Sequence, residues 1–282
     1  MTAAGFGGAS VREALDSAVI AIAAAGSDTA RLDAELLLAD ALGVDRLTLL
    51  ADSRREVEGT AVRAFQDAVH RRSAGREPVA YILGRRGFRY IDLTVDARVL
   101  VPRPETELLV EVGIELPQGA RVADVGTGSG AVALALKDER PDLVIVATDV
   151  SPDALVVARA NAARLELHVE FVHGDLLEGA GPVDAVLSNP PYVAEAQRAT
   201  LAPEIMRHEP PGALFAGADG LDVIRRLVPA AADAGAALLA IEVGEGQAPE
   251  VAELMRAVGY VDAGARRDLA GIERVVVGRL PR

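Results

Sequence analysis

A short polar stretch at residues 188–192 follows the apolar run 183–187, and its residue types suit the binding of a neutral nitrogen. Asn189 offers a side-chain carbonyl acceptor and an NH₂ donor without charge, and Tyr192 offers an aromatic face. The two prolines between them have no N–H and a fixed φ, so the carbonyl groups there are not all used by a continuing strand. The stretch therefore suits a planar NH₂ group, although a strand-ending turn explains Asn and Pro equally well.

A glycine-rich segment at residues 124–130, Asp-Val-Gly-Thr-Gly-Ser-Gly, is the second candidate. Glycine has no Cβ, so this segment can turn sharply and approach a ligand closely. The helix expected after it would add free N–H groups at its amino end. We therefore expect a cofactor here. Gly126, Gly128 and Ala131 also satisfy the dinucleotide pattern G-x-G-x-x-A, which leaves a nicotinamide-dependent oxidoreductase as an alternative.

Acidic residues follow the next two expected strands. Asp149 ends the second strand at about the spacing of a ribose-binding acid, and Asp175 follows the third. Asp175 is placed either to accept a hydrogen bond from an adenine amino group or to cap a turn. Because the carboxyl ends of parallel strands share one edge of a sheet, these acids, the glycine-rich segment and Asn189 should converge on one crevice.

The second half of the chain alternates strand-like and helix-like segments, which predicts a mainly parallel, doubly wound α/β sheet. The last two expected strands are close together in sequence, so they should pair as an antiparallel hairpin. We expect strands at residues 121–125, 143–149, 168–173, 183–188, 236–243, 261–267 and 273–279, and helices at 129–137, 152–165, 220–233 and 246–258.

Residues 1–76 are expected to form a small helical bundle. Ser10 and Glu13 match a capping box before the first helix. The second helix is expected at residues 29–42, with Gly43 as its cap. A short third helix should follow at residues 47–51, and a fourth helix at residues 59–73. The expected inner face of the second helix consists of Leu32, Leu36 and Leu37.

Residues 77–104 are expected to be a linker with a β-hairpin, and residues 105–282 the third domain. Apolar residues in the linker partly alternate with polar ones, as in strands with one buried face. These are Phe88, Tyr90, Leu93, Val95, Val99 and Val101. The neighbourhood is locally basic, and we interpret its arginines as solvated surface in preference to a docking patch. They are Arg71, Arg72, Arg76, Arg85, Arg86 and Arg89.

The composition excludes several kinds of protein. There is no cysteine, so disulfides, thiolate metal sites and a cysteine nucleophile are excluded, and the 4 histidines lack metal-ligand spacing. The net charge of -13 argues against a nucleic-acid-binding surface spread over the whole protein. The apolar residues 18–25 are too few to span a bilayer. We expect a cytoplasmic protein with no metal, no direct nucleic-acid partner and no membrane partner.

The order of these motifs resembles a class I S-adenosylmethionine-dependent methyltransferase acting on an amino or amide nitrogen. From about Ser10 onward the chain is similar to the release factor glutamine methyltransferases. This narrower resemblance rests on residues 77–84 (Glu-Pro-Val-Ala-Tyr-Ile-Leu-Gly), on residues 100–107 (Leu-Val-Pro-Arg-Pro-Glu-Thr-Glu), and on Glu209-Pro210 with Ala213-Leu214. It implies a Rossmann-like methyltransferase sheet behind an N-terminal helical domain that docks the substrate.

The resemblance also implies the ligands. S-adenosyl-L-methionine would be bound by Gly126, Thr127, Gly128, Ser129, Gly130, Asp149, Asp175, Leu176 and Asn189. The family can carry an aromatic residue at the position of Leu176, so leucine keeps an apolar contact but removes stacking. The substrate would be the glutamine of the Gly-Gly-Gln motif in class I peptide chain release factors. It would be held by Arg103, Asn189, Pro190, Pro191 and Tyr192, of which Asn189, Pro190 and Tyr192 would act in catalysis.

Other functions use the same motifs. A sister enzyme could methylate a glutamine of a ribosomal protein, and a base-amino methyltransferase could act on RNA or DNA. The acidity of the chain and the lack of a further large target-reading domain argue against DNA. An inactive methyltransferase-like interaction module is disfavoured by the intact set of motifs.

Overall fold

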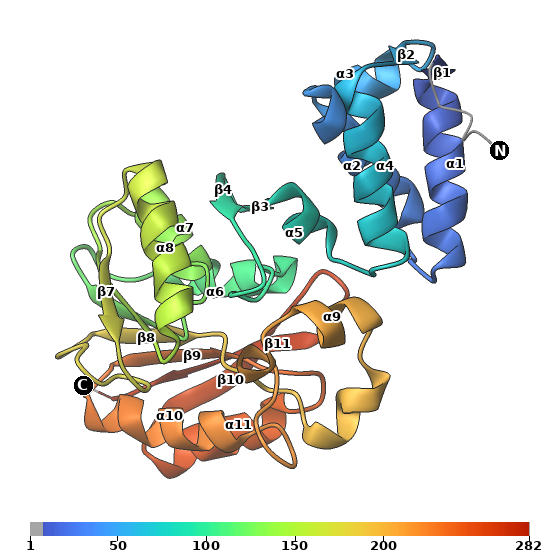
Figure 1. Ribbon diagram of the computed structural model, residues 1–282. Coiled ribbons are helices and arrows are strands. Elements are labelled where there is room, and N and C mark those ends of the chain that lie inside the picture. The colour runs from blue at the N-terminus through green and yellow to red at the C-terminus, as the bar shows by residue number, and fades with distance from the viewer. Residues whose placement is uncertain (1–7, 282) are drawn as a thin grey trace. The chain divides into compact units, whose positions relative to one another are not determined.

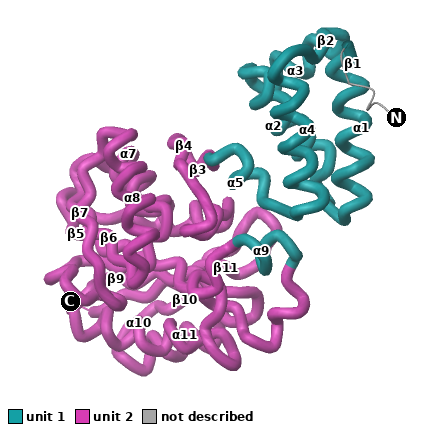
Figure 2. Tube along the Cα trace, viewed as in Figure 1, with its two compact units in different colours: residues 1–84, 202–208 teal, residues 85–201, 209–282 magenta. Residues whose placement is uncertain are grey.

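The computed structural model describes residues 8–281 and divides the chain into two compact units (Figure 2). The helical unit contains the chain up to Gly84 together with Ala202–His208, and the sheet unit contains Arg85–Leu201 and the chain from Glu209 onward. A short segment from the second half of the chain therefore belongs to the helical unit. No helix among the described residues is long and apolar enough to cross a membrane.

The helical unit contains the expected helices and two that were not predicted. Ser10 and Glu13 form the expected capping box, in which the Ser10 N–H donates to the Glu13 carboxylate at 2.8 Å. Gly43 caps its helix with a φ of 65°, a conformation that glycine adopts without strain. The elements are β1 (Ala9–Ser10), α1 (Val11–Ala24), α2 (Ala30–Leu42), α3 (Arg46–Ala51), β2 (Glu56–Val57), α4 (Thr60–Ser73) and the unpredicted α5 (Val79–Leu83) and α9 (Pro203–His208).

The predicted inner face of α2 is wrong at Leu32. This side chain is 40% exposed, whereas Asp33 and Leu37 are buried. Asp33 accepts hydrogen bonds from the Arg72 guanidinium at 2.7 Å and from the Ser27 hydroxyl at 2.9 Å. Because these donors compensate the loss of water around the carboxylate, a charged residue lies in the interior and the adjacent leucine faces outward.

The predicted solvated arginine surface is also wrong for several of its members. Arg72 and Arg76 are buried, and both form ion pairs with Glu204 of α9. Arg71 binds Glu77 through two hydrogen bonds of 2.8 and 2.6 Å. These arginines neutralise carboxylates of their own unit, which explains why the sequence is locally basic without forming a basic patch there.

The linker forms the expected hairpin from β3 (Arg85–Phe88) and β4 (Ile91–Thr94). Phe88 and Leu93 are buried as expected, but Tyr90 is 80% exposed. Because Phe88 pairs with Ile91, Arg89 and Tyr90 are the two turn residues between the strands. Alternation along the sequence does not apply within such a turn, so the prediction for Tyr90 is wrong.

The sheet unit is built on a seven-stranded sheet in the order β10-β11-β9-β8-β5-β6-β7. Strands β7, β6, β5, β8 and β9 are parallel, and β11 runs antiparallel to both β9 and β10. This confirms the predicted mainly parallel sheet with an antiparallel C-terminal hairpin. The strands are β5 (Arg121–Val125), β6 (Val144–Asp149), β7 (Glu170–His173), β8 (Ala185–Ser188), β9 (Leu238–Glu242), β10 (Val261–Arg267) and β11 (Glu273–Arg279).

Helices cover both faces of this sheet (Figure 1). On one face lie α6 (Glu107–Ile114), α7 (Ala131–Glu139) and α8 (Pro152–Leu165), and on the other lie α10 (Asp222–Asp233) and α11 (Ala248–Ala257). Short 3₁₀ turns occur at η1 (Pro104–Thr106), η2 (Glu195–Thr200) and η3 (Pro211–Ala213). This layered arrangement is the doubly wound fold that the alternation predicted.

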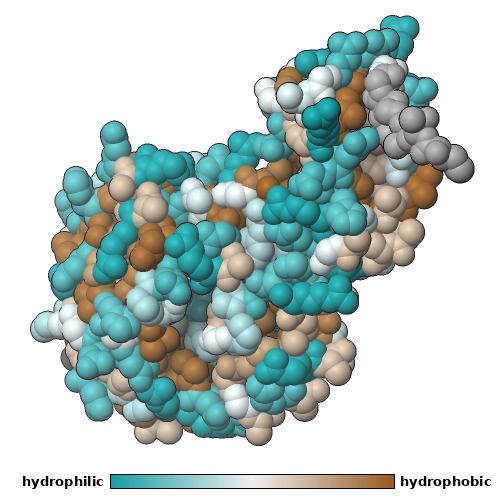
Figure 3. Space-filling model, in the orientation of Figure 1, coloured by the Kyte–Doolittle hydropathy of each residue, from teal (hydrophilic) through white to brown (hydrophobic). Residues whose placement is uncertain are grey.

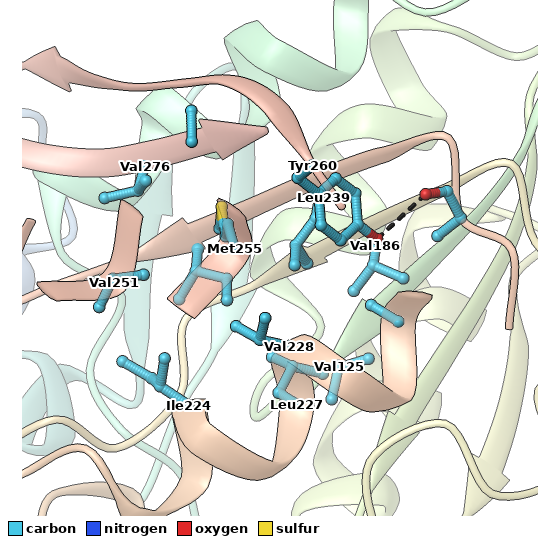
Figure 4. Close-up of a cluster of buried hydrophobic side chains, with 14 of the residues drawn as sticks. Val125, Val186, Ile224, Leu227, Val228, Leu239, Val251, Met255, Tyr260 and Val276 are labelled. Carbon is cyan, nitrogen blue, oxygen red and sulfur yellow. Dashed lines mark hydrogen bonds between the residues drawn. The ribbon is translucent and has the colours of Figure 1, made fainter. Parts of the chain in front are cut away.

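The core beneath α10 and α11 is apolar and tightly packed (Figure 4). Val186 and Leu239 from adjacent strands lie with Leu227 of α10 and Met255 of α11 in one buried cluster. The Tyr260 hydroxyl reaches into this cluster and donates to the carbonyl of Ala236 at 3.0 Å. This apolar core therefore holds in place the strands that carry the candidate residues.

Asn161 of α8 joins three parts of the sheet unit. Its side chain is fully buried, and its Oδ1 accepts from the Thr94 N–H at 2.8 Å. Its Nδ2 donates to the carbonyls of Thr94 and Ser129 at 3.0 and 2.9 Å. One amide thereby holds the linker strand β4 and the glycine-rich segment against the same helix.

We expect Asn161→Ala to lower the free energy of unfolding by about 2–4 kcal/mol, because three backbone groups would lose their partner in the interior. Urea unfolding measures this change. Val156→Ala is the matched control, since Val156 is an exposed residue of the same helix. If Asn161→Ala lowers the free energy of unfolding no more than the control does, Asn161 does not hold these segments together as inferred.

Candidate active site

Polar residues and the glycine-rich segment lie along one edge of the sheet, where parallel strands end. The strand that carries the segment, β5, pairs with β8 on one side and with β6 on the other. All of these elements belong to the sheet unit. In the order of the strands from β9 to β7, the residues at or just after their ends are Glu242, Asn189, Gly126, Asp149 and Asp175.

The glycine-rich segment turns tightly between β5 and α7. Gly126, Gly128 and Gly130 have φ values of 75°, 56° and 85°, which residues with a Cβ rarely adopt. A Cβ on Gly130 would lie 2.9 Å from Leu134 Cδ1, whereas a Cβ on Gly128 would meet nothing within 4 Å. The segment is therefore packed against the protein at Gly130 and open at Gly128.

Two carboxylates hold this segment in place. Asp149 accepts hydrogen bonds from the Gly128 N–H at 2.9 Å and the Ser151 N–H at 2.8 Å. Asp124 accepts from the Thr127 hydroxyl at 2.6 Å. Burial raises the pKa of Asp124 to about 6, and burial also raises the pKa of Asp149 although its N–H donors oppose the shift. The predicted ribose-binding acid thus also orders the glycine loop.

Asn189 lies beside this segment, with its backbone oxygen 3.9 Å from the position of a Cβ on Gly126. Its side-chain Nδ2 donates to Thr106 Oγ1 at 3.0 Å. Within residues 8–281, no hydrogen bond reaches the Asn189 Oδ1 or the Pro190 carbonyl. Two neutral acceptors therefore remain available next to the glycine-rich segment.

Tyr192 is held at its side chain and its backbone. Its hydroxyl donates to Glu242 Oε1 at 3.2 Å, and its carbonyl accepts from Gln247 Nε2 at 3.0 Å. A Cβ on Gly220 would lie only 2.2 Å from that carbonyl, so the close approach requires glycine. Burial and the neighbouring Glu242 raise the pKa of Tyr192, which keeps the phenol neutral.

Glu242 ends β9 and is 1% exposed. Burial raises its pKa to about 7, while hydrogen bonding by Thr106 and Tyr192 opposes the shift. Its Oε2 is buried and has no hydrogen-bond partner among the described residues. Glu242 is therefore joined to Tyr192 by one hydrogen bond, and its second carboxylate oxygen is left unpaired in the interior.

Asp175 and Leu176 follow β7 at the far end of the same edge. The Asp175 carboxylate forms an ion pair with Arg226 of α10. The Leu176 carbonyl accepts from the Thr148 hydroxyl at 2.6 Å, and its side chain packs against the core. The structure therefore places both residues at the predicted edge, with Asp175 already paired to a cation.

Arg103 precedes η1 and donates to Glu209 at 2.6 Å. The Glu209 side chain is buried, and Arg103 is partly exposed. The ion pair joins the Pro-Arg-Pro-Glu segment to the Glu-Pro dipeptide, two segments on which the resemblance rested. Arg103 thus orders the chain around Thr106 as well as presenting a cation at the surface.

Four residues of this edge were missed in the sequence. Thr106 ends η1, within the segment at residues 100–107 on which the resemblance rests, and Gln247 directly precedes α11, but neither was assigned a role from the sequence. Glu242 could have been found, since it ends a predicted strand on the predicted edge. Val150 could also have been found, because it directly follows Asp149, and its side chain is 68% exposed at this edge.

Neither a metal site nor the cavity of the helical unit provides an alternative candidate site. No group of three potential metal ligands occurs in the described part of the chain. The helical unit has a cavity of about 200 Å³ between α1 and α4, lined mainly by alanine and valine with no charged side chain. Hydrophobic residues also reach the surface of that unit between polar ones (Figure 3). The sheet edge therefore remains the candidate site.

Known families match both parts of the chain. Residues 13–84 match the PrmC N-terminal domain, and residues 104–241 match the methyltransferase small domain. The release factor glutamine methyltransferase of Deinococcus radiodurans is 44% identical, covering 95% of this chain and 98% of its own. The protein with the same name from Koribacter versatilis is 42% identical, covering 96% of this chain and 99% of its own.

A solved structure supports the fold. The hMettl16 catalytic domain, in complex with a MAT2A 3′UTR hairpin, has a TM-score of 0.55 and 17% identity, covering 81% of this chain and 86% of its own. At this identity the likeness concerns the fold alone. The near-complete coverage by relatives above 40% identity is the stronger finding, and it shows that this chain belongs to the release factor glutamine methyltransferase family.

Proposed function

We propose that this enzyme transfers a methyl group from S-adenosyl-L-methionine to the side-chain amide nitrogen of a glutamine, the one in the Gly-Gly-Gln motif of class I peptide chain release factors. The observation that carries the proposal is a pair of acceptors, Asn189 Oδ1 and the Pro190 carbonyl, that have no hydrogen-bond partner among the described residues, where the backbone of Asn189 passes beside Gly126. A primary amide has two N–H hydrogens, and two acceptors match them.

The residues at the edge fit the cofactor. A ligand can approach Gly128 because no atom lies within 4 Å of its missing Cβ. We assign the cofactor to residues 126–130, with the Asp149 carboxylate on the ribose hydroxyls. Val150 and Leu176 supply apolar surface for the adenine, and Asp175 can accept from its amino group while staying paired with Arg226. The bound cofactor supplies an electrophilic methyl group.

The protein's contribution is to position the nitrogen. An amide nitrogen is a poor nucleophile because its lone pair is delocalised into the carbonyl. If Asn189 Oδ1 and the Pro190 carbonyl each accept one N–H, the amide is held with its nitrogen facing the glycine-rich segment. Such positioning lowers the activation barrier of methyl transfer by several kcal/mol. The same two neutral acceptors stabilise positive charge that develops on the nitrogen. We expect Pro191 and Tyr192 to pack against the flat amide.

The remaining parts of the chain would bind the rest of the protein substrate. We assign docking of the release factor to the N-terminal helical domain at residues 1–76, joined by the linker at residues 77–104 to the methyltransferase domain at residues 105–282. Arg103 contributes a partly exposed cation near the acceptors. A substrate of the translation machinery places the enzyme in the cytoplasm.

The function is tested by incubating the enzyme and S-adenosylmethionine with a release factor, a set of ribosomal proteins, and RNA and DNA oligonucleotides. Mass spectrometry then locates the added methyl group. We expect it on the glutamine of Gly-Gly-Gln. Methylation of another protein alone, or of nucleic acid alone, would overturn the proposed substrate.

We expect Asn189→Ala to lower turnover by about 100-fold or more, since it removes one of two acceptors that hold the reacting group. Cofactor affinity should change little, because the glycine-rich segment and Asp149 are intact. Single-turnover kinetics and a cofactor titration measure the two effects separately. Near-normal turnover would contradict the assignment of Asn189.

Asp149→Ala should have the opposite pattern and weaken cofactor binding by about tenfold or more, because a charge-assisted acceptor is lost. Isothermal titration calorimetry measures this affinity. Asp153→Ala is the control, as Asp153 is an exposed acid in the first turn of the following helix. The assignment fails if both variants bind the cofactor equally well.

A further inference from the structure

Gln247, which directly precedes α11, holds the end of the acceptor turn at residues 189–192. Its side-chain Oε1 accepts from the Gly244 N–H at 2.8 Å. Its Nε2 donates to two backbone carbonyls, that of Tyr192 at 3.0 Å and that of Asp219 at 3.3 Å. All four residues belong to the sheet unit. One amide therefore joins the loop after β9, the acceptor turn and the loop before α10.

The orientation of this amide is determined by its three partners. An amide oxygen only accepts hydrogen bonds, and an NH₂ group only donates them. Turning the amide over would place its NH₂ against the Gly244 N–H and its oxygen against two carbonyls, so all three hydrogen bonds would be lost. Two glycines leave space for it, since a Cβ on Gly220 would lie 2.9 Å from Nε2 and one on Gly244 would lie 3.0 Å from Oε1. The Gln247 donor therefore faces the acceptor turn.

The acceptor turn depends on a donor from another segment because of its two prolines. Pro190 and Pro191 have no N–H, so this part of the backbone cannot be held by donating hydrogen bonds. The turn is held at its two ends instead, through the side chain of Asn189 and through the bond from Gln247 to the Tyr192 carbonyl. Because proline also has a fixed φ, few torsions remain between the Pro190 carbonyl and the Tyr192 carbonyl.

We propose that Gln247 is a positioning residue for methyl transfer, which fixes the direction of the Pro190 carbonyl and the plane of the Tyr192 ring. This inference rests on the proposed function. Gln247 acts through the turn, since its own amide is used by backbone groups. The ring is confined elsewhere by the bond from its hydroxyl to Glu242 at 3.2 Å and by Gly244, where a Cβ would lie 3.3 Å from Tyr192 Cδ2. Without the Gln247 donor, the acceptor carbonyl would lose its fixed direction.

Two substitutions separate the two halves of the amide. In Gln247→Glu at about pH 8 the carboxylate is ionised, so it can accept from the Gly244 N–H but cannot donate to the Tyr192 carbonyl. In Gln247→Met a side chain of similar size makes neither bond. With a release factor as substrate, we expect both variants to lower the single-turnover rate constant by about tenfold or more, because a hydrogen bond that holds the reacting geometry is lost.

The same two substitutions at Gln118 are the matched control. Gln118 is exposed and lies shortly before β5, so it is at the opposite end of that strand from the glycine-rich segment. Gln118→Glu and Gln118→Met should keep the wild-type rate. Isothermal titration calorimetry should give an unchanged affinity for S-adenosylhomocysteine in all four variants. In the Gln247 variants, the release factor concentration that gives half the maximal rate should change less than the rate itself.

An NMR measurement distinguishes positioning from a general loss of structure. The chain has 4 tyrosines, so isotope-labelled tyrosine gives few ring signals, and Tyr192→Phe and Tyr260→Phe identify two of them. We expect the Tyr192 signal to shift or broaden in Gln247→Glu and Gln247→Met, because its ring is no longer held in one orientation. The signal of Tyr260, which is buried in the core, should stay unchanged.

The outcomes separate this inference from the proposed function. A wild-type enzyme that does not methylate the glutamine would overturn the function. If the wild type does so and Gln247→Glu keeps the normal rate, the donor is unnecessary and the role of Gln247 is wrong. A loss of rate accompanied by a changed Tyr260 signal, or by an equal loss of cofactor affinity, would also overturn that role, because Gln247 would then support the fold in general.

Discussion

The parallel pairing of β5 with β8 and β6 is the interaction on which the rest of the site depends. It places the glycine-rich segment between the turn that carries Asn189 and the strand that ends in Asp149. None of these groups is close to another in the sequence. Backbone hydrogen bonds between strands fix their spacing to a few ångströms, and the apolar core beneath α10 and α11 fixes the sheet itself. Cofactor groups and acceptor groups are therefore neighbours by virtue of strand order.

Buried polar groups then give this edge its detailed shape. Asn161 fixes the glycine-rich segment from the side of α8, and Asp149 binds the Gly128 N–H from the side of β6. Thr106 orients Asn189, and Glu242 anchors Tyr192. A polar group in the interior costs free energy unless it has partners, so each of these side chains has few favourable orientations. Reorienting any of these supporting side chains would cost free energy, so they hold the site in one arrangement.

The helical unit illustrates where local patterns give a wrong prediction. The spacing of leucines predicted that Leu32 lies on the buried face of α2, but the ion pair of Asp33 with Arg72 decides which face of this helix is buried. The arginines near residue 72 read as solvated surface, yet Arg72 and Arg76 bind Glu204, a residue more than a hundred positions further along the chain. Hydrophobic periodicity carries no information about such partners. The prediction for Tyr90 is wrong for a simpler reason, because Tyr90 lies in the hairpin turn, where the alternation of buried and exposed residues ends.

The sequence by itself determined most of the helices, the strands and the mainly parallel sheet, because periodicity, glycine and proline act locally, but it did not predict α5 and α9. It also indicated Asn189, the glycine-rich segment and Asp149, since a residue at the end of a parallel strand lies at the ligand-binding edge of the sheet. Only the tertiary structure decided that Thr106 receives the Asn189 NH₂, that Glu242 accepts from the Tyr192 hydroxyl, and that Asp175 is paired with Arg226. Hydrogen-bond partners depend on distances between segments that only folding brings together, so no local pattern encodes them.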